Sequence, residues 1–147
     1  MLEPGPGMGY FTIELARLAG SSGRVVCVDV QPKMIERLKR RAAKAGVLDR
    51  LDARVAPAES MGLDDVQGSV DFTLAFAVVH EFPDAARCFS EIAAASKSGA
   101  SLLVAEPSGH VKSTEFDSQL QTASQVGFRV IGRPAIRGSR AALLKKT

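Results

Sequence analysis

The chain has 147 residues, a hydrophobic content of 46% and a formal net charge of +3, which fit one soluble globular domain over residues 1–147. No run approaches the roughly 18 to 20 apolar residues of a membrane-spanning helix, and the amino terminus lacks a signal-peptide pattern, so we expect a cytoplasmic protein. Cys27 and Cys88 are expected to be buried thiols, and the absence of metal-ligand spacing argues against a bound metal.

The sequence pI of about 9.1 raises the question of a nucleic-acid partner. Many of the basic residues lie on one predicted helix, whose other face carries Ile35, Leu38 and Ala42. Charges on the opposite face are therefore what a solvated helix surface requires. Aromatic residues make up only 5% of the chain and Trp is absent, which leaves few platforms for stacking bases. We disfavour nucleic acid and keep RNA only as a minor substrate alternative.

Short apolar strands and amphipathic helices alternate along the first half of the chain. Strands are predicted at residues 2–3, 24–30 and 51–55, and helices at 10–19 and 32–45. The first helix should bury Phe11, Leu15 and Leu18. The run Val25–Val28 is continuously apolar, which is typical of a parallel strand covered on both faces.

The second half continues the alternation and then changes. Strands are predicted at residues 70–79, 100–106, 128–131 and 141–144; one helix starts near Asp84 and is stopped by Gly99, and another is capped by Ser113 and closed by Gly127. The pattern predicts an α/β fold with a largely parallel sheet. Only residues 132–140 join the last two strands, too few for a parallel crossover, so the final strand should be antiparallel to its neighbour.

A glycine-rich segment, residues 3–9, joins the first strand to the first helix. Glycines at alternate positions can take positive φ and lack a Cβ, so a ligand can lie against the backbone, where the helix presents unpaired amides. Asp29 closes the second strand beside this loop, where it can accept hydrogen bonds from ribose hydroxyls. Each feature alone also fits an ordinary turn. Together, at this spacing, they favour an adenosine-type cofactor.

Three features separate this loop from a dinucleotide site. The glycines read Gly-x-Gly-x-Gly with Tyr10 at the sixth position, Glu3 precedes them, and the last strand is expected to be reversed. An anion at the loop repels pyrophosphate and attracts an ammonium. From Glu3 to Lys145 the chain resembles the class I S-adenosylmethionine-dependent methyltransferases. The resemblance implies a Rossmann-like three-layer sandwich, a mostly parallel sheet with a reversed last strand, S-adenosyl-L-methionine as cofactor and a small-molecule methyl acceptor.

The resemblance also implies roles for residues at the strand ends. The matched cofactor-binding positions are Glu3, Gly5, Gly7, Asp29, Ala58, Glu59, Phe76 and Ala77. Pro57 stands where family members often have an Asp for the adenine amino group, so adenine recognition is expected to use the Ala58 backbone and apolar contacts. His80 is the candidate proton acceptor. It is otherwise a polar strand-end residue or a substrate contact, because an in-line methyl transfer can proceed without a base.

Two alternative functions stay open: a cofactor-binding module without catalysis, because the amino-terminal helices that cover the substrate in this family are lacking, and an NAD-dependent dehydrogenase. Most of the first strand is also lacking, since only residues 1–3 remain of it. We therefore expect that Met1 is an internal or misassigned start. Unpaired strand groups and uncovered apolar surface would then make this form marginally stable or homo-oligomeric, unless cofactor or a partner chain compensates.

Overall fold

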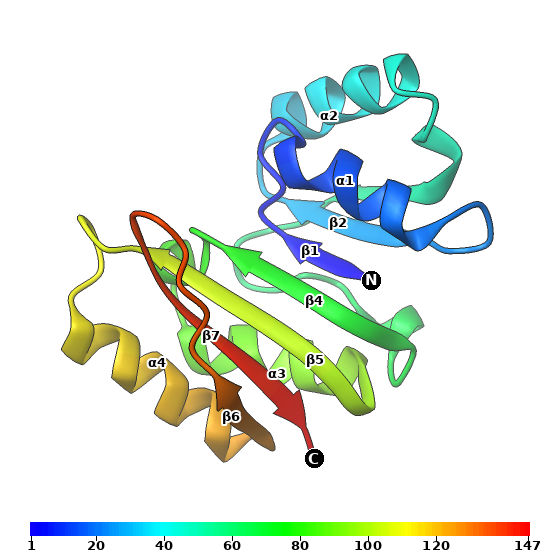
Figure 1. The fold of residues 1–147 in the computed structure, drawn as a ribbon. Helices are drawn as coiled ribbons and strands as arrows, with labels where there is room; N and C mark the ends of the chain where they lie inside the picture. Colours follow the sequence, from blue (N-terminus) through cyan, green and yellow to red (C-terminus); the bar gives the residue numbers. More distant parts are fainter. The chain divides into compact units, whose positions relative to one another are not determined.

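The computed structural model of the protein describes all residues, Met1–Thr147, and divides into two compact units, Met1–Pro57 and Ala58–Thr147. Figure 1 labels the helices and strands of each unit. None of the helices combines the length and the apolar character needed to cross a bilayer.

The first unit is a three-stranded parallel sheet with two helices. Its elements are β1 (Leu2–Pro4), α1 (Tyr10–Ala19), β2 (Val25–Asp29), α2 (Pro32–Lys44), a 3-10 turn (Leu48–Arg50) and β3 (Leu51–Val55). The strand order is β3-β2-β1, and Pro4 lies opposite Val28 in the register. Residues 25–28 are all buried, as the continuous apolar run predicts.

The buried face of α1 differs from the predicted one. Leu15 is buried, but the side chains of Phe11 and Leu18 are 43% and 76% exposed. The inward positions belong instead to a stripe that includes Thr12 and Ile13. Thr12 is polar yet buried because it donates a hydrogen bond to Glu3, and this orientation turns Phe11 and Leu18 outward.

The second unit holds four strands and two helices. Its elements are a 3-10 turn (Asp64–Val66), β4 (Val70–Phe76), a 3-10 turn (Val79–Glu81), α3 (Ala85–Ala95), β5 (Ser96–Pro107), α4 (Ser113–Gln125), β6 (Phe128–Gly132) and β7 (Ser139–Lys146). The strand order is β4-β5-β7-β6. β4 and β5 are parallel, whereas β7 is antiparallel to both β5 and β6. The predicted reversal of the final strand is therefore confirmed.

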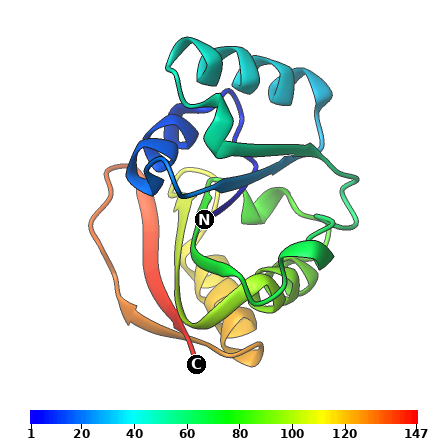
Figure 2. The same cartoon turned by 90° about the vertical axis from the view of Figure 1, so that its right-hand side faces the viewer.

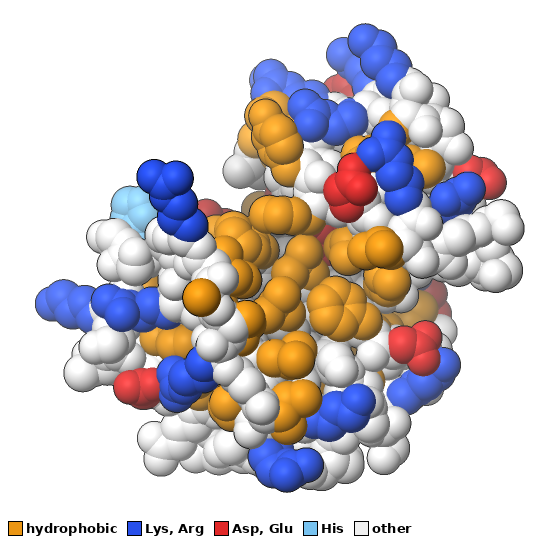
Figure 3. All heavy atoms as spheres, viewed as in Figure 1, with side chains coloured by type: hydrophobic (Ala, Val, Ile, Leu, Met, Phe, Trp, Pro, Cys, Tyr) orange, Lys and Arg blue, Asp and Glu red, His pale blue; other side chains and the backbone are white.

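The helices α3 and α4 lie on the same side of β4, β5 and β7 (Figure 2). The core beneath them includes the residues predicted for the two helix faces: Cys88, Phe89, Ile92, Phe116, Leu120 and Ala123. On the opposite side of these strands, Leu103 lies opposite Leu143 in the register, and both are half-buried. Apolar side chains gather over this region in Figure 3.

Two predicted boundaries around β4 and α3 are wrong. β4 ends at Phe76 rather than at residue 79, because Ala77 takes a left-handed φ of 53° and turns the chain. The helix α3 ends at Ala95 rather than before Gly99, because Ser96 already pairs with Val70 as the first residue of β5.

The predicted cap of α4 is also wrong. Lys112 occupies the N-cap position without a side-chain cap, and Ser113 is the first helical residue. Asp84, in contrast, caps α3 by accepting hydrogen bonds from the amides of Ala86 and Arg87.

Cys27 and Cys88 are free and buried, as predicted. Burial is the main cause that raises the pKa of the Cys27 thiol far above its usual range. It also raises the pKa of Cys88 to about 12, with nearby carboxylates adding to the effect. Because the thiolate is the reactive form, neither side chain is a nucleophile at neutral pH.

Candidate functional site

The glycine loop of the first unit leaves β1 beside the end of β2. The amide of Gly5 donates to the carbonyl oxygen of Val28 over 2.8 Å, so the loop starts next to Asp29. Gly5 and Gly7 take left-handed φ values of 63° and 57°. A Cβ placed on Gly7 would meet no atom within 4 Å. The space beside Gly7 is therefore open, which a ligand lying against the backbone would require.

Gly9 has a different function in the same loop. Its φ is 90°, and a Cβ at this position would lie 2.4 Å from Cδ1 of Leu38 on α2. Two helices that follow successive parallel strands in one direction lie on the same face of the sheet. Gly9 therefore permits the close packing of α1 against α2.

Glu3 is a buried acid at the end of β1. Its side chain is 3% exposed, and Oε2 accepts a hydrogen bond from the Thr12 hydroxyl over 2.5 Å. Burial raises the pKa of Glu3 from its ordinary 4.5 to about 7, and the Thr12 hydrogen bond opposes this change only in part. No Lys or Arg forms an ion pair with it. A ligand ammonium would supply the missing positive charge.

Asp29 stands at the carboxyl end of β2 with a fixed side chain. Its Oδ1 accepts from the Gln31 amide over 2.9 Å, and its carbonyl oxygen accepts from the Ala56 amide over 3.1 Å. The structure shows no partner for Oδ2. One carboxylate oxygen therefore holds the turn into α2, and the other is available to a ribose hydroxyl.

In the second unit, Ala58 and Glu59 are exposed and line a cavity of about 140 Å³. The other walls include Phe82 and Pro83, before α3, and residues of the first turns of α3. The cavity is thus lined by both apolar and charged side chains.

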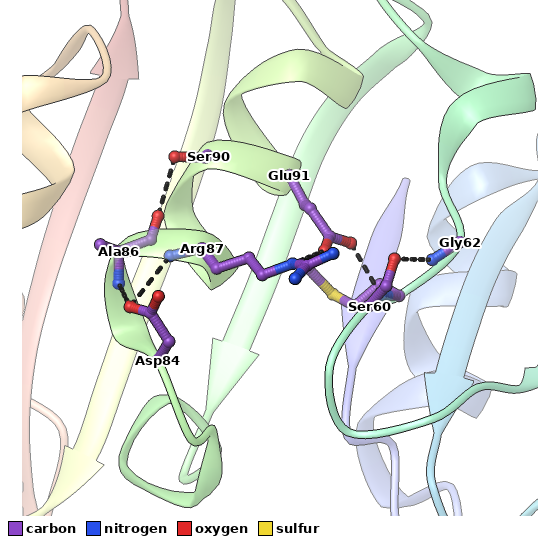
Figure 4. Close-up of polar contacts among 8 residues, drawn as sticks. Ser60, Gly62, Asp84, Ala86, Arg87, Ser90 and Glu91 are labelled. Carbon is purple, nitrogen blue, oxygen red and sulfur yellow. Dashed lines mark hydrogen bonds and ion pairs between the residues drawn. The ribbon is translucent and has the colours of Figure 1, made fainter.

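A network of polar contacts holds the segment after Glu59 against α3 (Figure 4). The Glu91 carboxylate accepts from the Met61 amide over 2.7 Å and from Nε of Arg87 over 3.3 Å. The amide of Gly62 donates to the hydroxyl of Ser60 over 3.2 Å. Sequence reasoning missed this network, because it joins residues 30 positions apart and no local pattern marks it.

The end of β4 carries the remaining predicted residues. Phe76 and Ala77 are half-buried, and the Ala77 amide donates to the Ala105 carbonyl oxygen over 2.7 Å. His80 follows in the 3-10 turn, with its side chain 24% exposed and Nδ1 3.0 Å from Oε2 of Glu106. The His80 and His110 rings are nearly parallel, with centroids 6.5 Å apart.

Glu106 is the residue that sequence analysis missed. It lies in β5 with no exposed surface, one residue before the strand ends at Pro107. The sequence does mark this residue: Glu106 is an acid at the end of an apolar strand, as are Glu3 and Asp29.

The structure brings the predicted residues together within each unit. In the first, Glu3, Gly5, Gly7 and Asp29 meet at the carboxyl ends of β1 and β2. In the second, Phe76, Ala77 and His80 follow one another at the end of β4, and Ala58 and Glu59 line the cavity beside α3. A buried acid without a basic partner, an open glycine loop and an aspartate with one carboxylate oxygen unbound are groups that could bind S-adenosylmethionine.

Comparison with known proteins identifies the family. A family model described as a methyltransferase domain matches residues 2–104. The chain belongs to this family. A 58-residue segment is 47% identical to catechol O-methyltransferase of Mycobacterium tuberculosis, over 40% of this chain and 26% of that protein. A 51-residue segment is 41% identical to a probable cobalt-precorrin-6B C(15)-methyltransferase (decarboxylating) of Saccharolobus solfataricus, over 35% of this chain and 26% of that protein.

The matched segments span about a quarter of the length of these curated relatives. A solved structure, a SAM-dependent methyltransferase from Aquifex aeolicus, superposes on 99% of this methyltransferase domain and on 81% of that chain, with a TM-score of 0.83 and 20% identity. The predicted Rossmann-like α/β fold and the predicted family are therefore confirmed. S-adenosylmethionine, the predicted cofactor, is the cofactor of this family.

Proposed function

We propose that this methyltransferase domain binds S-adenosylmethionine and transfers its methyl group to a small-molecule acceptor. The observation that carries the proposal is the buried Glu3 carboxylate, which has the Thr12 hydroxyl as its partner and no basic residue. Glu3 then binds the methionine ammonium, and the open backbone at Gly7, which follows the left-handed turn at Gly5, admits the cofactor. Asp29 binds the ribose through its second carboxylate oxygen.

The second unit contributes the adenine and acceptor contacts in this proposal. Ala58 and Glu59, which line the cavity beside α3, contact the adenine. Phe76 and Ala77, at the end of β4, lie next to the methyl group that is transferred. His80 accepts the proton that the acceptor loses. Catechol is the first acceptor to test, because the M. tuberculosis protein that shares the 58-residue segment is a catechol O-methyltransferase.

Calorimetry with S-adenosylhomocysteine and with NAD tests the cofactor. We expect binding of S-adenosylhomocysteine alone, and binding of NAD in its place would overturn the proposal in favour of a dehydrogenase. Turnover of S-adenosylmethionine with catechol and with a broad panel of small acceptors tests the transfer. Cofactor binding without methylation of any acceptor would instead support a cofactor-binding module.

A further inference from the structure

The buried carboxylate of Glu106 organises the turn that follows β4. Oε1 accepts from the Val78 amide over 3.1 Å, and Oε2 accepts from the His80 amide over 3.0 Å. Nε2 of Gln119, on α4, lies 3.1 Å from Oε2. Glu106 therefore ties the backbone on both sides of residue 79, directly after the left-handed turn at Ala77.

The same carboxylate holds the His80 ring. Nδ1 of His80 lies 3.0 Å from Oε2, so the backbone amide and the side chain of His80 both bind one oxygen. Because its backbone amide and its ring are both held by Glu106, the His80 side chain has little freedom to rotate. The Nδ1 edge of the ring faces Glu106, and Nε2 is the nitrogen left for another molecule.

The surrounding hydrogen bonds indicate which nitrogen carries the proton. Two backbone amides, which can only donate, already bind the two oxygens of Glu106. The Gln119 amide also donates to Glu106, and its own oxygen is buried without a partner. These N–H donors around Glu106 favour its ionised form, which can only accept hydrogen bonds. Nδ1 must then be protonated, which leaves the lone pair of the neutral ring on Nε2.

We propose that Glu106 is a positioning residue for methyl transfer: it fixes His80 in the Nδ1–H tautomer so that Nε2 removes the proton of the methyl acceptor. This inference rests on the proposed function, which makes His80 the proton acceptor. The acceptor oxygen forms a bond to the methyl carbon, the carbon–sulfur bond breaks with its electron pair left on sulfur, and the acceptor proton moves to Nε2. Glu106 then faces a positively charged imidazolium.

The arrangement also defines a class of acceptor. A single imidazole base removes a proton from a phenolic or enolic hydroxyl more readily than from an aliphatic alcohol, because the more acidic hydroxyl gives up its proton at a smaller cost. Acceptors that carry no proton on the reacting atom, such as tertiary amines and thioethers, gain nothing from Nε2. We therefore infer that acceptors with an acidic hydroxyl are the substrates of this site.

The tautomer of His80 can be measured directly. The chain has only two histidines, so a two-bond proton–nitrogen correlation spectrum of the labelled protein contains two imidazole patterns, and His110→Asn identifies the one from His80. The spectrum is recorded at a pH at which the nitrogen shifts themselves show a neutral ring. We expect the wild-type His80 pattern to be that of Nδ1–H. An Nε2–H pattern would overturn the proposal without any variant.

Glu106→Gln keeps the size of the side chain but cannot accept from all four donors. We expect loss of the pure Nδ1–H pattern in a folded protein, whereas Glu115→Gln, at an exposed position of α4, should leave it unchanged. An unchanged tautomer in folded Glu106→Gln would overturn the positioning role. Binding of S-adenosylhomocysteine, measured on the same samples, should be retained in both variants; its absence in the wild type would refute the proposed function instead.

Discussion

The hydroxyl of Thr12, in α1, donates a hydrogen bond to the carboxylate of Glu3, in β1, and both side chains are buried. This one neutral donor leaves the pKa of Glu3 at about 7, far above its ordinary value of 4.5. A cation placed beside such a carboxylate favours its charged form and therefore lowers its pKa. Two predictions depend on this property.

Binding of an ammonium-bearing ligand should depend on pH through Glu3. Below about pH 7 the free protein carries a neutral Glu3, which must release a proton before it can pair with an ammonium. The dissociation constant of S-adenosylhomocysteine should therefore rise as pH falls from about 7 to about 5.5, approaching tenfold per pH unit. Calorimetry at several pH values, in buffers of different ionisation enthalpy, measures both the affinity and the released proton.

Adenosine lacks the ammonium and is the matched ligand control, while Glu3→Gln is the matched variant. Neither adenosine with the wild type nor S-adenosylhomocysteine with Glu3→Gln should show this pH dependence. Glu3→Gln should also weaken S-adenosylhomocysteine more than adenosine. Equal losses for the two ligands would remove Glu3 from the ammonium site.

Stability of the ligand-free protein should change in the opposite direction. Because the folded-state pKa of Glu3 is raised, the folded protein binds more protons than the unfolded chain between about pH 4.5 and 7. The contribution of Glu3 to the free energy of unfolding therefore falls as pH rises through this window, by at most about 3 kcal/mol at 1.36 kcal/mol per pKa unit. Urea unfolding of the wild type and Glu3→Gln at pH 4.5 and 7.5 measures this contribution. If the free energy of unfolding changes equally with pH in the two proteins, the prediction is wrong.

The elements that sequence reasoning placed best are those with local boundary signals. The helix Tyr10–Ala19 lies between glycines, and β3 at Leu51–Val55 has the predicted ends. The end of β4 was missed because the apolar run continues through Val79, whereas the chain turns at the left-handed Ala77 and is held there by contacts with β5. A pattern of residue types cannot reveal a contact between segments 28 positions apart.

Contacts between distant segments also explain which site residues the sequence predicts and which it misses. Glu3 and Asp29 stand beside a glycine loop, and their positions follow from the motif. The role of Glu106 follows from its contacts with His80 and Gln119, which depend on the packing of α4 against the sheet. Motif spacing thus identifies groups that we propose to contact the cofactor, whereas the groups that orient other side chains require the folded structure.

Asp29→Ala should weaken S-adenosylhomocysteine binding without unfolding the protein. Its Oδ2 has no partner in the structure, so the ribose gains a hydrogen bond to a charged group, worth about 1.5 to 3 kcal/mol. Calorimetry measures the loss, and Asp49→Ala, an exposed aspartate of the same unit, is the control. An unchanged dissociation constant for Asp29→Ala would exclude a contact with the ribose.

Gly7→Ala and Gly9→Ala should have different consequences, although the two glycines share one loop and both have left-handed φ. Each substitution adds backbone strain of roughly 1 to 2 kcal/mol. At Gly9 the new methyl group also meets Leu38 at 2.4 Å, so this variant should lose more stability in thermal unfolding. At Gly7 the methyl group enters open space, so the protein should stay folded.

The open space at Gly7 is where the cofactor is proposed to lie. Gly7→Ala should therefore weaken S-adenosylhomocysteine binding beyond the cost of strain, at least tenfold in the dissociation constant. Gly46→Ala, at another left-handed glycine with nothing within 4 Å, adds similar strain after the end of α2, away from the loop, and serves as the control. If Gly7→Ala binds as tightly as Gly46→Ala while both remain folded, the cofactor does not approach the backbone at Gly7.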